Sequence, residues 1–135
     1  MRPEDRAAQI RAERAHGENA LRAARALVAL GLYNDAVSRA YYAAFHLARC
    51  ILLSDGVETK THGAVISMIG LHFVSSGRLP AERAKDLGRL QQFRALADYD
   101  PFFVFTKEGA EEELAAAGRF TSAAIALLDA PDAPP

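Results

Sequence analysis

The sequence predicts an all-α protein, folded as an up-and-down bundle of about five helices. Apolar residues recur at three- and four-residue spacing in several long segments, which is the period of an amphipathic helix. Glycine or proline stands near the ends of these segments, where helices stop or start. Half of the 135 residues are hydrophobic and 24% are charged, which is the composition of one globular domain able to bury a core.

The first helix is expected to begin at Pro3, since proline suits the first helical turn, and to end at Gly31. Gly17 lies within this helix and is expected to weaken or bend it. The second helix is expected to run from Asn34-Asp35, two good N-cap residues, to Ser54-Asp55-Gly56. Small residues dominate its narrow apolar stripe, so a neighbouring helix can approach it closely.

The third helix is expected over His62–Ser75 with Thr61 as its cap, and Pro80 is expected to open a fourth. Asp100-Pro101 ends the fourth helix, because the residue before a proline avoids helical geometry. The apolar segment Phe102–Phe105 follows in a predicted loop. We expect it to be a core plug or a dimer surface.

The last helix is expected to begin after the cap Thr106 and to end at Leu128. The following seven residues include three prolines and two aspartates, a composition that cannot build a packed core. The domain is therefore expected to be residues 1–128, a helical bundle, with 129–135 as a disordered tail.

Charge is distributed unevenly along the chain, although the formal net charge is only −1. Residues 1–97 carry 14 Lys and Arg against 9 Asp and Glu, whereas residues 98–135 carry 2 against 8. A basic body beside an acidic segment can steer a polyanion to one side. Thirteen of the sixteen cations are arginine, the residue that binds phosphate bidentately, although a GC-rich genome also favours Arg and Ala codons.

Several classes of function are disfavoured. No apolar run reaches the roughly 18 residues that cross a bilayer, and the start of the chain is polar, so we expect a cytoplasmic protein without membrane contact. The lone Cys50 is expected to be a small buried hydrophobe. No Gly-rich phosphate loop or nucleophile elbow is present. We expect neither metal nor cofactor, because no metal-ligand spacing joins Cys50 or acidic neighbours to the histidines, His16, His46, His62 and His72.

Two clusters of residues could carry chemistry. Arg39, Tyr42 and His46 lie three and four residues apart on the second helix, so they share one face. Arg94 and Asp98 are four residues apart on the fourth helix and can pair, yet Asp98 sits at the end where the helix dipole disfavours an acid. Either an arginine of another helix holds Asp98, or Asp98 is kept for binding, or the pair is purely structural.

A third position of interest is the start of the third helix, where Lys60 and His62 stand. Free backbone N–H groups and the helix dipole favour anions there, so a phosphate or nucleotide could bind. The alternative is a solvent-facing cap with a neutral histidine.

Four separate segments resemble the HEPN family of prokaryotic helical proteins. The segments are Ser38–His46 (SRAYYAAFH), Lys60–Ser67, Phe73–Leu79 and Arg94–Asp100 (RALADYD). They match the branch with a Tyr-Tyr-Ala second helix and an Ala-Asp-Tyr ending to the fourth, and the resemblance spans about Ala20 to Phe120. It implies an up-and-down bundle that usually dimerises. It also implies a small, minimal nucleotidyltransferase as partner, the two often forming a toxin–antitoxin pair.

The resemblance also bears on catalysis. Many HEPN proteins are metal-independent ribonucleases whose motif is an arginine, four to six residues and a histidine, brought together as two copies in a dimer. Histidine moves protons near neutral pH, and arginine stabilises charge on the phosphorane. Arg94 occupies the place of the motif arginine, but no histidine follows within range, and Asp98 or Tyr99 stands there instead. Arg39 and His46 satisfy the spacing, but on the second helix.

Three hypotheses follow. The first is a regulatory or interaction protein, a homodimer with a nucleotidyltransferase partner, whose cleft binds RNA or a nucleotide and is lined by Arg39, Tyr42, Arg94, Asp98 and Tyr99. The second is an endoribonuclease toxin in which His46 or Tyr99 replaces the motif histidine and Arg94 holds the phosphate. The third is a structural dimer in which the Tyr and Arg cluster serves packing alone.

Overall fold

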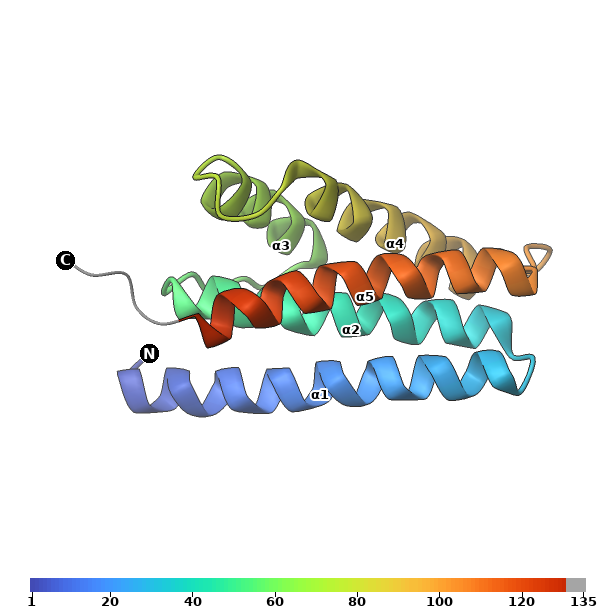
Figure 1. The fold of residues 1–135 in the computed structure, drawn as a ribbon, viewed down its shortest axis with the longest axis horizontal. Helices are drawn as coiled ribbons and strands as arrows, with labels where there is room; N and C mark the ends of the chain where they lie inside the picture. The colour runs from blue at the N-terminus through green and yellow to red at the C-terminus, as the bar shows by residue number, and fades with distance from the viewer. Residues whose placement is uncertain (131–135) are drawn as a thin grey trace.

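Five α-helices and one π-helical turn make up the computed structural model, which describes residues 1–130 (Figure 1). Their bounds are α1 Pro3–Ala29, α2 Tyr33–Ser54, α3 His62–Ile69, η1 Gly70–Val74, α4 Ala81–Tyr99 and α5 Lys107–Asp129. The long helices run alternately in opposite directions, and α2 lies between α1 and the α3–α4 pair. The predicted all-α class and five-helix bundle are confirmed. Within residues 1–130, no helix has both the length and the apolarity needed to cross a membrane.

The central helix is α2, which packs against α1, α3, α4 and α5. Twelve of its 22 residues are buried, and half of these twelve are alanine or cysteine. Cys50 is among them, as expected for a small hydrophobe, and its thiol donates to the carbonyl of Ile10 at 3.4 Å. Burial raises the pKa of this thiol to about 12, so it stays protonated. Because α2 is surrounded by other helices, its accessible side chains lie where it borders a neighbouring helix.

At Gly17, α1 packs tightly against α2. The helix continues through this residue without a break, so Gly17 does not end or divide it. A Cβ atom at Gly17 would collide with Leu47 Cδ2, and it would lie 3.2 Å from the carbonyl oxygen of Ala43. The absence of a side chain therefore sets how closely the two helices pack.

The predicted ends of helices are confirmed in three places. Gly31 has a φ of +77° and closes α1, and the amide of Leu32 donates to the carbonyl of Leu27 across it. Thr61 accepts from the amide of Ala64, and Thr106 accepts from the amide of Gly109, each at 3.0 Å.

The start of α2 differs from the prediction, since Leu32 is its N-cap and no side chain caps it. Asn34 lies in the first turn and binds the loop after α4. Its amide nitrogen donates to the carbonyl of Phe103, and its amide oxygen accepts from the amide of Phe105, both at 2.8 Å. The prediction failed because the Asn34 side chain bonds to distant backbone groups and not to its own helix end.

Side chains of the loop Phe102–Phe105 point alternately toward the core and toward solvent. Phe105 is 6% exposed and packs with Val37, whereas Phe102 is 92% exposed and Val104 is 77% exposed. Successive side chains of an extended segment point to opposite sides. The segment therefore fills the core with Phe105, as one alternative predicted, and exposes Phe102 and Val104 on the surface.

The third helix is shorter than predicted. It ends at Ile69 and continues as the π-helical turn η1, so a regular helix does not extend to Ser75. The wider turn accompanies the burial of Phe73, which is 1% exposed, while Leu71 remains 61% exposed.

The last helix extends one residue beyond the predicted end, to Asp129. The carboxylate of Asp129 pairs with Arg14 of α1, Nη1 to Oδ1 at 2.7 Å and Nη2 to Oδ2 at 3.1 Å. Asp129 thus belongs to the bundle. Residues 131–135, the remainder of the predicted tail, lie outside the described residues.

Replacing Gly17 by alanine is expected to lower the free energy of unfolding by about 1–3 kcal/mol, because the added methyl group overpacks the α1–α2 contact. The matched control is Gly118→Ala in α5, where a Cβ meets no atom within 4 Å. This change is expected to raise stability by about 0.5–1 kcal/mol through helix propensity alone. Urea unfolding of both variants checks this, and equal stabilisation by the two would contradict the tight contact at Gly17.

Candidate functional site

Arg94 joins α4 to α2. Its Nη2 donates to the hydroxyl of Tyr42 at 2.7 Å, and its Nε lies 2.9 Å from Oδ2 of Asp98 in an ion pair. The hydroxyl of Ser38 donates to Oδ1 of Asp98 at 2.9 Å. The predicted i, i+4 pair is therefore present. The second partner of Asp98 is a serine of α2, not an arginine of another helix.

Three tyrosine rings surround the guanidinium of Arg94. Its carbon lies 5.8 Å from the ring centroid of Tyr41, 5.3 Å from that of Tyr42 and 5.6 Å from that of Tyr99. Such distances allow cation–π attraction, which is stronger where water is excluded. The Arg94 side chain is only 17% exposed. Four of the predicted site residues, Tyr42, Arg94, Asp98 and Tyr99, thus converge at the junction of α2 and α4.

His62 packs inward against α2. Its Nδ1 lies 2.5 Å from the hydroxyl of Tyr41, and its ring stacks on Phe45 with centroids 4.3 Å apart. Burial raises the pKa of Tyr41 to about 12. Burial, with the positive charges of Arg94 and Arg49, lowers the pKa of His62. A lowered pKa favours the neutral ring at neutral pH, and the half-buried ring covers aromatic side chains of α2.

His46 is held by a carboxylate that the sequence interpretation missed. Oε2 of Glu13 lies 2.6 Å from Nδ1 of His46, and Oε1 of Glu13 lies 3.0 Å from Nη1 of Arg49. The Glu13 side chain is 10% exposed. An ionised carboxylate only accepts, which favours the tautomer with the proton on Nδ1 and leaves Nε2 without this partner. His46 also stacks on His16, with centroids 5.6 Å apart.

A signal for Glu13 was present in the sequence. It falls in register with Gly17, Ala20 and Ala24, the other buried residues of α1. An acid in a stripe of small residues requires a partner on the facing helix, because an unpaired buried charge is costly.

A groove of about 400 Å³ runs between α1 and α2. Its lining comes from His16, Asn19, Ala20 and Ala23 of α1 and from Arg39, Tyr42 and His46 of α2. The three residues predicted to share a face therefore share this groove. Tyr42 links it to the other cluster, because its ring lines the groove while its hydroxyl contacts Arg94. The guanidinium carbon of Arg39 lies 5.1 Å from the Tyr42 ring centroid.

Of the five residues predicted to line one cleft, only Arg39 and Tyr42 line this groove. Arg94, Asp98 and Tyr99 lie outside it, as do Lys60 and His62. Lys60 lines a separate hollow near the end of α2. Tyr99, 73% exposed, also borders a shallow apolar hollow of about 710 Å³ on the outer side of α4, together with Leu96 and Pro101. Among the described residues, no three His, Cys, Asp or Glu side chains lie close enough to hold a metal ion.

The stability of the protein is expected to fall as the pH drops below about 6.5, the pKa of an unperturbed histidine, toward the lower pKa of folded His62. The folded state disfavours the charged ring, so below this pH the unfolded chain binds more protons. His62→Asn, which keeps a hydrogen-bonding group near Tyr41, is expected to flatten the dependence between pH 7.5 and 5. Tyr41→Phe is the control: it lowers stability throughout but keeps the slope, because burial is the main cause of the shift. Thermal unfolding across this range checks both, and an unchanged slope in His62→Asn would refute the assignment.

Known proteins resemble this chain over much of its length. A UPF0332 protein of Gloeobacter violaceus is 42% identical over 82 residues, which are 61% of this chain and 65% of that protein. A protein of Methanocaldococcus jannaschii named "Putative toxin MJ0605" is 42% identical over 82 residues, 61% of either chain. Another "Putative toxin" of the same organism is 32% identical over 94 residues, 70% of this chain and 64% of its own. The chain spans less than two thirds of the length of these relatives.

The family model described as the HEPN domain matches residues 11–127, from α1 to the last turns of α5. This stretch includes both clusters described above and the groove that joins them. The chain therefore belongs to the HEPN domain family.

Proposed function

We propose that this protein is one half of a toxin–antitoxin pair, a HEPN homodimer that binds RNA in the groove along α2 and has a minimal nucleotidyltransferase as its partner. The observation that carries the proposal is the position of Tyr42, which connects the groove of Arg39 and His46 to the cluster of Arg94, Asp98 and Tyr99. Relatives named as toxins support the toxin-like role. The pairing with a nucleotidyltransferase rests on the family resemblance.

The chemistry of the groove suits RNA. Unpaired bases stack on aromatic or imidazole rings, and arginine holds the phosphates. Tyr42 and the stacked pair His16–His46 provide the rings. Arg39 provides the cation, since within residues 1–130 it forms no ion pair with a carboxylate. Arg94 is already paired with Asp98, so its role is to hold the Tyr42 hydroxyl, and Arg39 contacts the phosphate.

A second copy of the chain is the proposed cover for the apolar surface at the end of α4. Leu96, Tyr99, Phe102 and Val104 are between 37% and 92% exposed there. A cluster of exposed apolar side chains is typical of an interaction surface. Tyr99 contacts both this surface and Arg94, so dimerisation would place two copies of the Arg94 cluster near each other.

Binding of a labelled single-stranded RNA, measured by fluorescence anisotropy, tests the proposal. Arg39→Ala is expected to weaken binding about 10-fold, as the loss of one charge-assisted hydrogen bond does. The control Arg22→Ala removes the same charge from an exposed position of α1 outside the groove and should bind as the wild type does. Size-exclusion chromatography of the protein alone should show a dimer, and with the product of the adjacent gene, expected to be a nucleotidyltransferase, it should show a complex. Equal affinity of the two variants and the absence of both assemblies would contradict the proposal.

An endoribonuclease is the second candidate, and the Glu13–His46 contact favours it. A carboxylate that orients one ring nitrogen of a histidine leaves the other for proton transfer, and His46 lines the groove. This places a proton-transferring group beside Arg39 and Tyr42, although not at the position of the family motif. Tyr99 is the alternative group for proton transfer. Its ring contacts the guanidinium of Arg94, however, and this cation cannot accept a proton from the Tyr99 hydroxyl.

Incubation of total RNA and tRNA with the purified protein tests the second candidate. His46→Asn retains a hydrogen bond to Glu13 but cannot transfer a proton, so it is expected to reduce cleavage by about 10²–10⁴-fold. Arg94→Ala, which releases the Tyr42 hydroxyl, is expected to reduce cleavage as well, whereas Arg22→Ala should cleave normally. RNA that stays intact at a large excess of wild-type protein would eliminate the enzyme and leave the binding proposal standing.

A further inference from the structure

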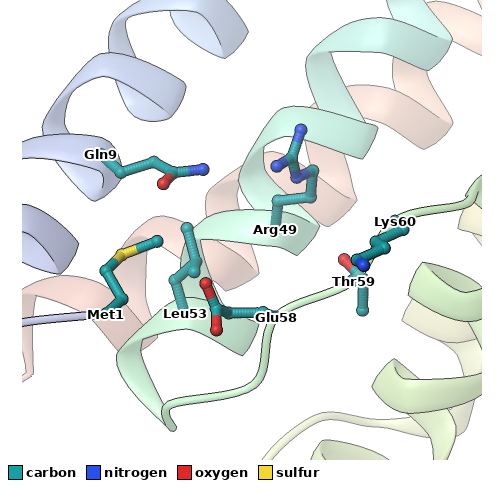
Figure 2. Close-up of a pocket in the computed structure, with 7 residues that line it drawn as sticks. All are labelled: Met1, Gln9, Arg49, Leu53, Glu58, Thr59 and Lys60. Carbon is teal, nitrogen blue, oxygen red and sulfur yellow. The ribbon is translucent and has the colours of Figure 1, made fainter.

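A second hollow, of about 210 Å³, lies beyond the groove toward the end of α2. Figure 2 shows it, with Gln9 entering from α1, Arg49 and Leu53 rising from α2, and Thr59 and Lys60 on the segment that follows. Glu58 also lines it, but in this view its carboxylate is directed away from Lys60. The cationic side of the hollow is therefore formed by Arg49 and Lys60.

The two hollows follow one another along the same seam. Their α2 residues are spaced three and four apart, which places them in one stripe of the helix: Arg39, Tyr42, His46, Arg49 and Leu53. Their α1 residues, from Gln9 to Ala23, keep the matching spacing on the antiparallel helix. From Arg39 to Leu53 the stripe is roughly 21 Å long at 1.5 Å per residue.

Glu13 bridges the two hollows without making the seam acidic. One of its oxygens contacts His46 of the first hollow and the other contacts Arg49 of the second. Its negative charge is thus countered by groups on either side, and the ion pair uses only one terminal nitrogen of Arg49. The remaining donors of that guanidinium stay available to a ligand.

We infer that this seam is a track for single-stranded RNA, running from Arg39 past His46 to Lys60. The inference rests on the proposed RNA binding and specifies its course and the form of the RNA. Cations stand at both ends and in the middle, and the flat faces of Tyr42, His16 and His46 lie between them. Bases reach such faces only when they are unpaired. The length of the seam suits about four nucleotides, the lower range of single-strand sites.

A length series of oligonucleotides tests the track. Affinity is expected to rise from a dinucleotide to a tetranucleotide and to change little for an octanucleotide. A duplex of the same sequence is expected to bind at least 10-fold more weakly. Similar affinity for a mononucleotide and an octanucleotide would overturn the track and indicate a nucleotide pocket in one hollow.

Lys60→Ala separates the second hollow from the first. For the octanucleotide it is expected to weaken binding about five-fold and to reduce the slope of log affinity against log salt by about 0.7, the value for one phosphate contact of a single strand. For the dinucleotide, which occupies the first hollow, it should change neither. Lys85→Ala, an equal loss of charge on exposed α4, is the control and should leave both unchanged. No effect of Lys60→Ala on the octanucleotide would overturn the track while RNA binding itself persists, whereas the absence of binding by every RNA would reject the proposed function.

Discussion

The close contact of α1 with α2 is the constraint on which the site depends. Gly17 lies against Leu47 and Ala43, and the small residues of both helices allow the two backbones to approach. At this separation Glu13 reaches His46, and His16 reaches the same ring. A wider spacing would draw Glu13 away from its partners and open the seam. The packing of small residues therefore determines the geometry of the polar groups at the edge of α2.

Paired charges occupy the two junctions of α2, and their role is positional. A buried ion pair gains little net stability, because desolvation offsets the attraction, but removing the partners of a buried carboxylate such as Glu13 costs about 3–5 kcal/mol. Glu13 with His46 and Arg49 fixes the α1 side, while Arg94 with Asp98 and Ser38 fixes the α4 side. Each network leaves an aromatic or imidazole ring held in one orientation. Such fixed rings are what stacking of a base requires.

Much of the fold could be predicted from the sequence because its signals are local. The helical period, the caps Thr61 and Thr106 and the glycine at position 31 each act within one turn, and the structure confirms them. The pairing of Arg94 with Asp98 is local in the same sense. The contacts of Glu13 and Asn34 span 33 and about 70 residues. The local pattern marks Glu13 as buried, but it does not identify the partners of either residue. The division of Phe102–Phe105 into buried and exposed halves also depends on where Asn34 holds the loop.

The acidic C-terminal segment repels a polyanion less than its sequence suggests, because some of its carboxylates form ion pairs with arginines. Glu113 is 1% exposed and pairs with Arg89 at 2.7 Å, and Asp129 pairs with Arg14. Such contacts use acids of α5 to bind helices α1 and α4. They also consume two of the arginines that made the body basic.

Ion pairing also changes the role of Arg94, the arginine at the motif position. Asp98 stands beside Arg94 and neutralises much of its charge, so Arg94 is a weak partner for a phosphate while that pair persists. Arg39, on the other side of the Tyr42 ring, has no such acid in the part of the chain that the structure describes. If RNA binds along α2, the phosphate contact therefore passes from α4 to α2, where His46 also lies. In that case His46 of α2 would stand in for the histidine that the motif on α4 lacks. Tyr42 connects the two places, because it contacts Arg94 and lines the groove with His46.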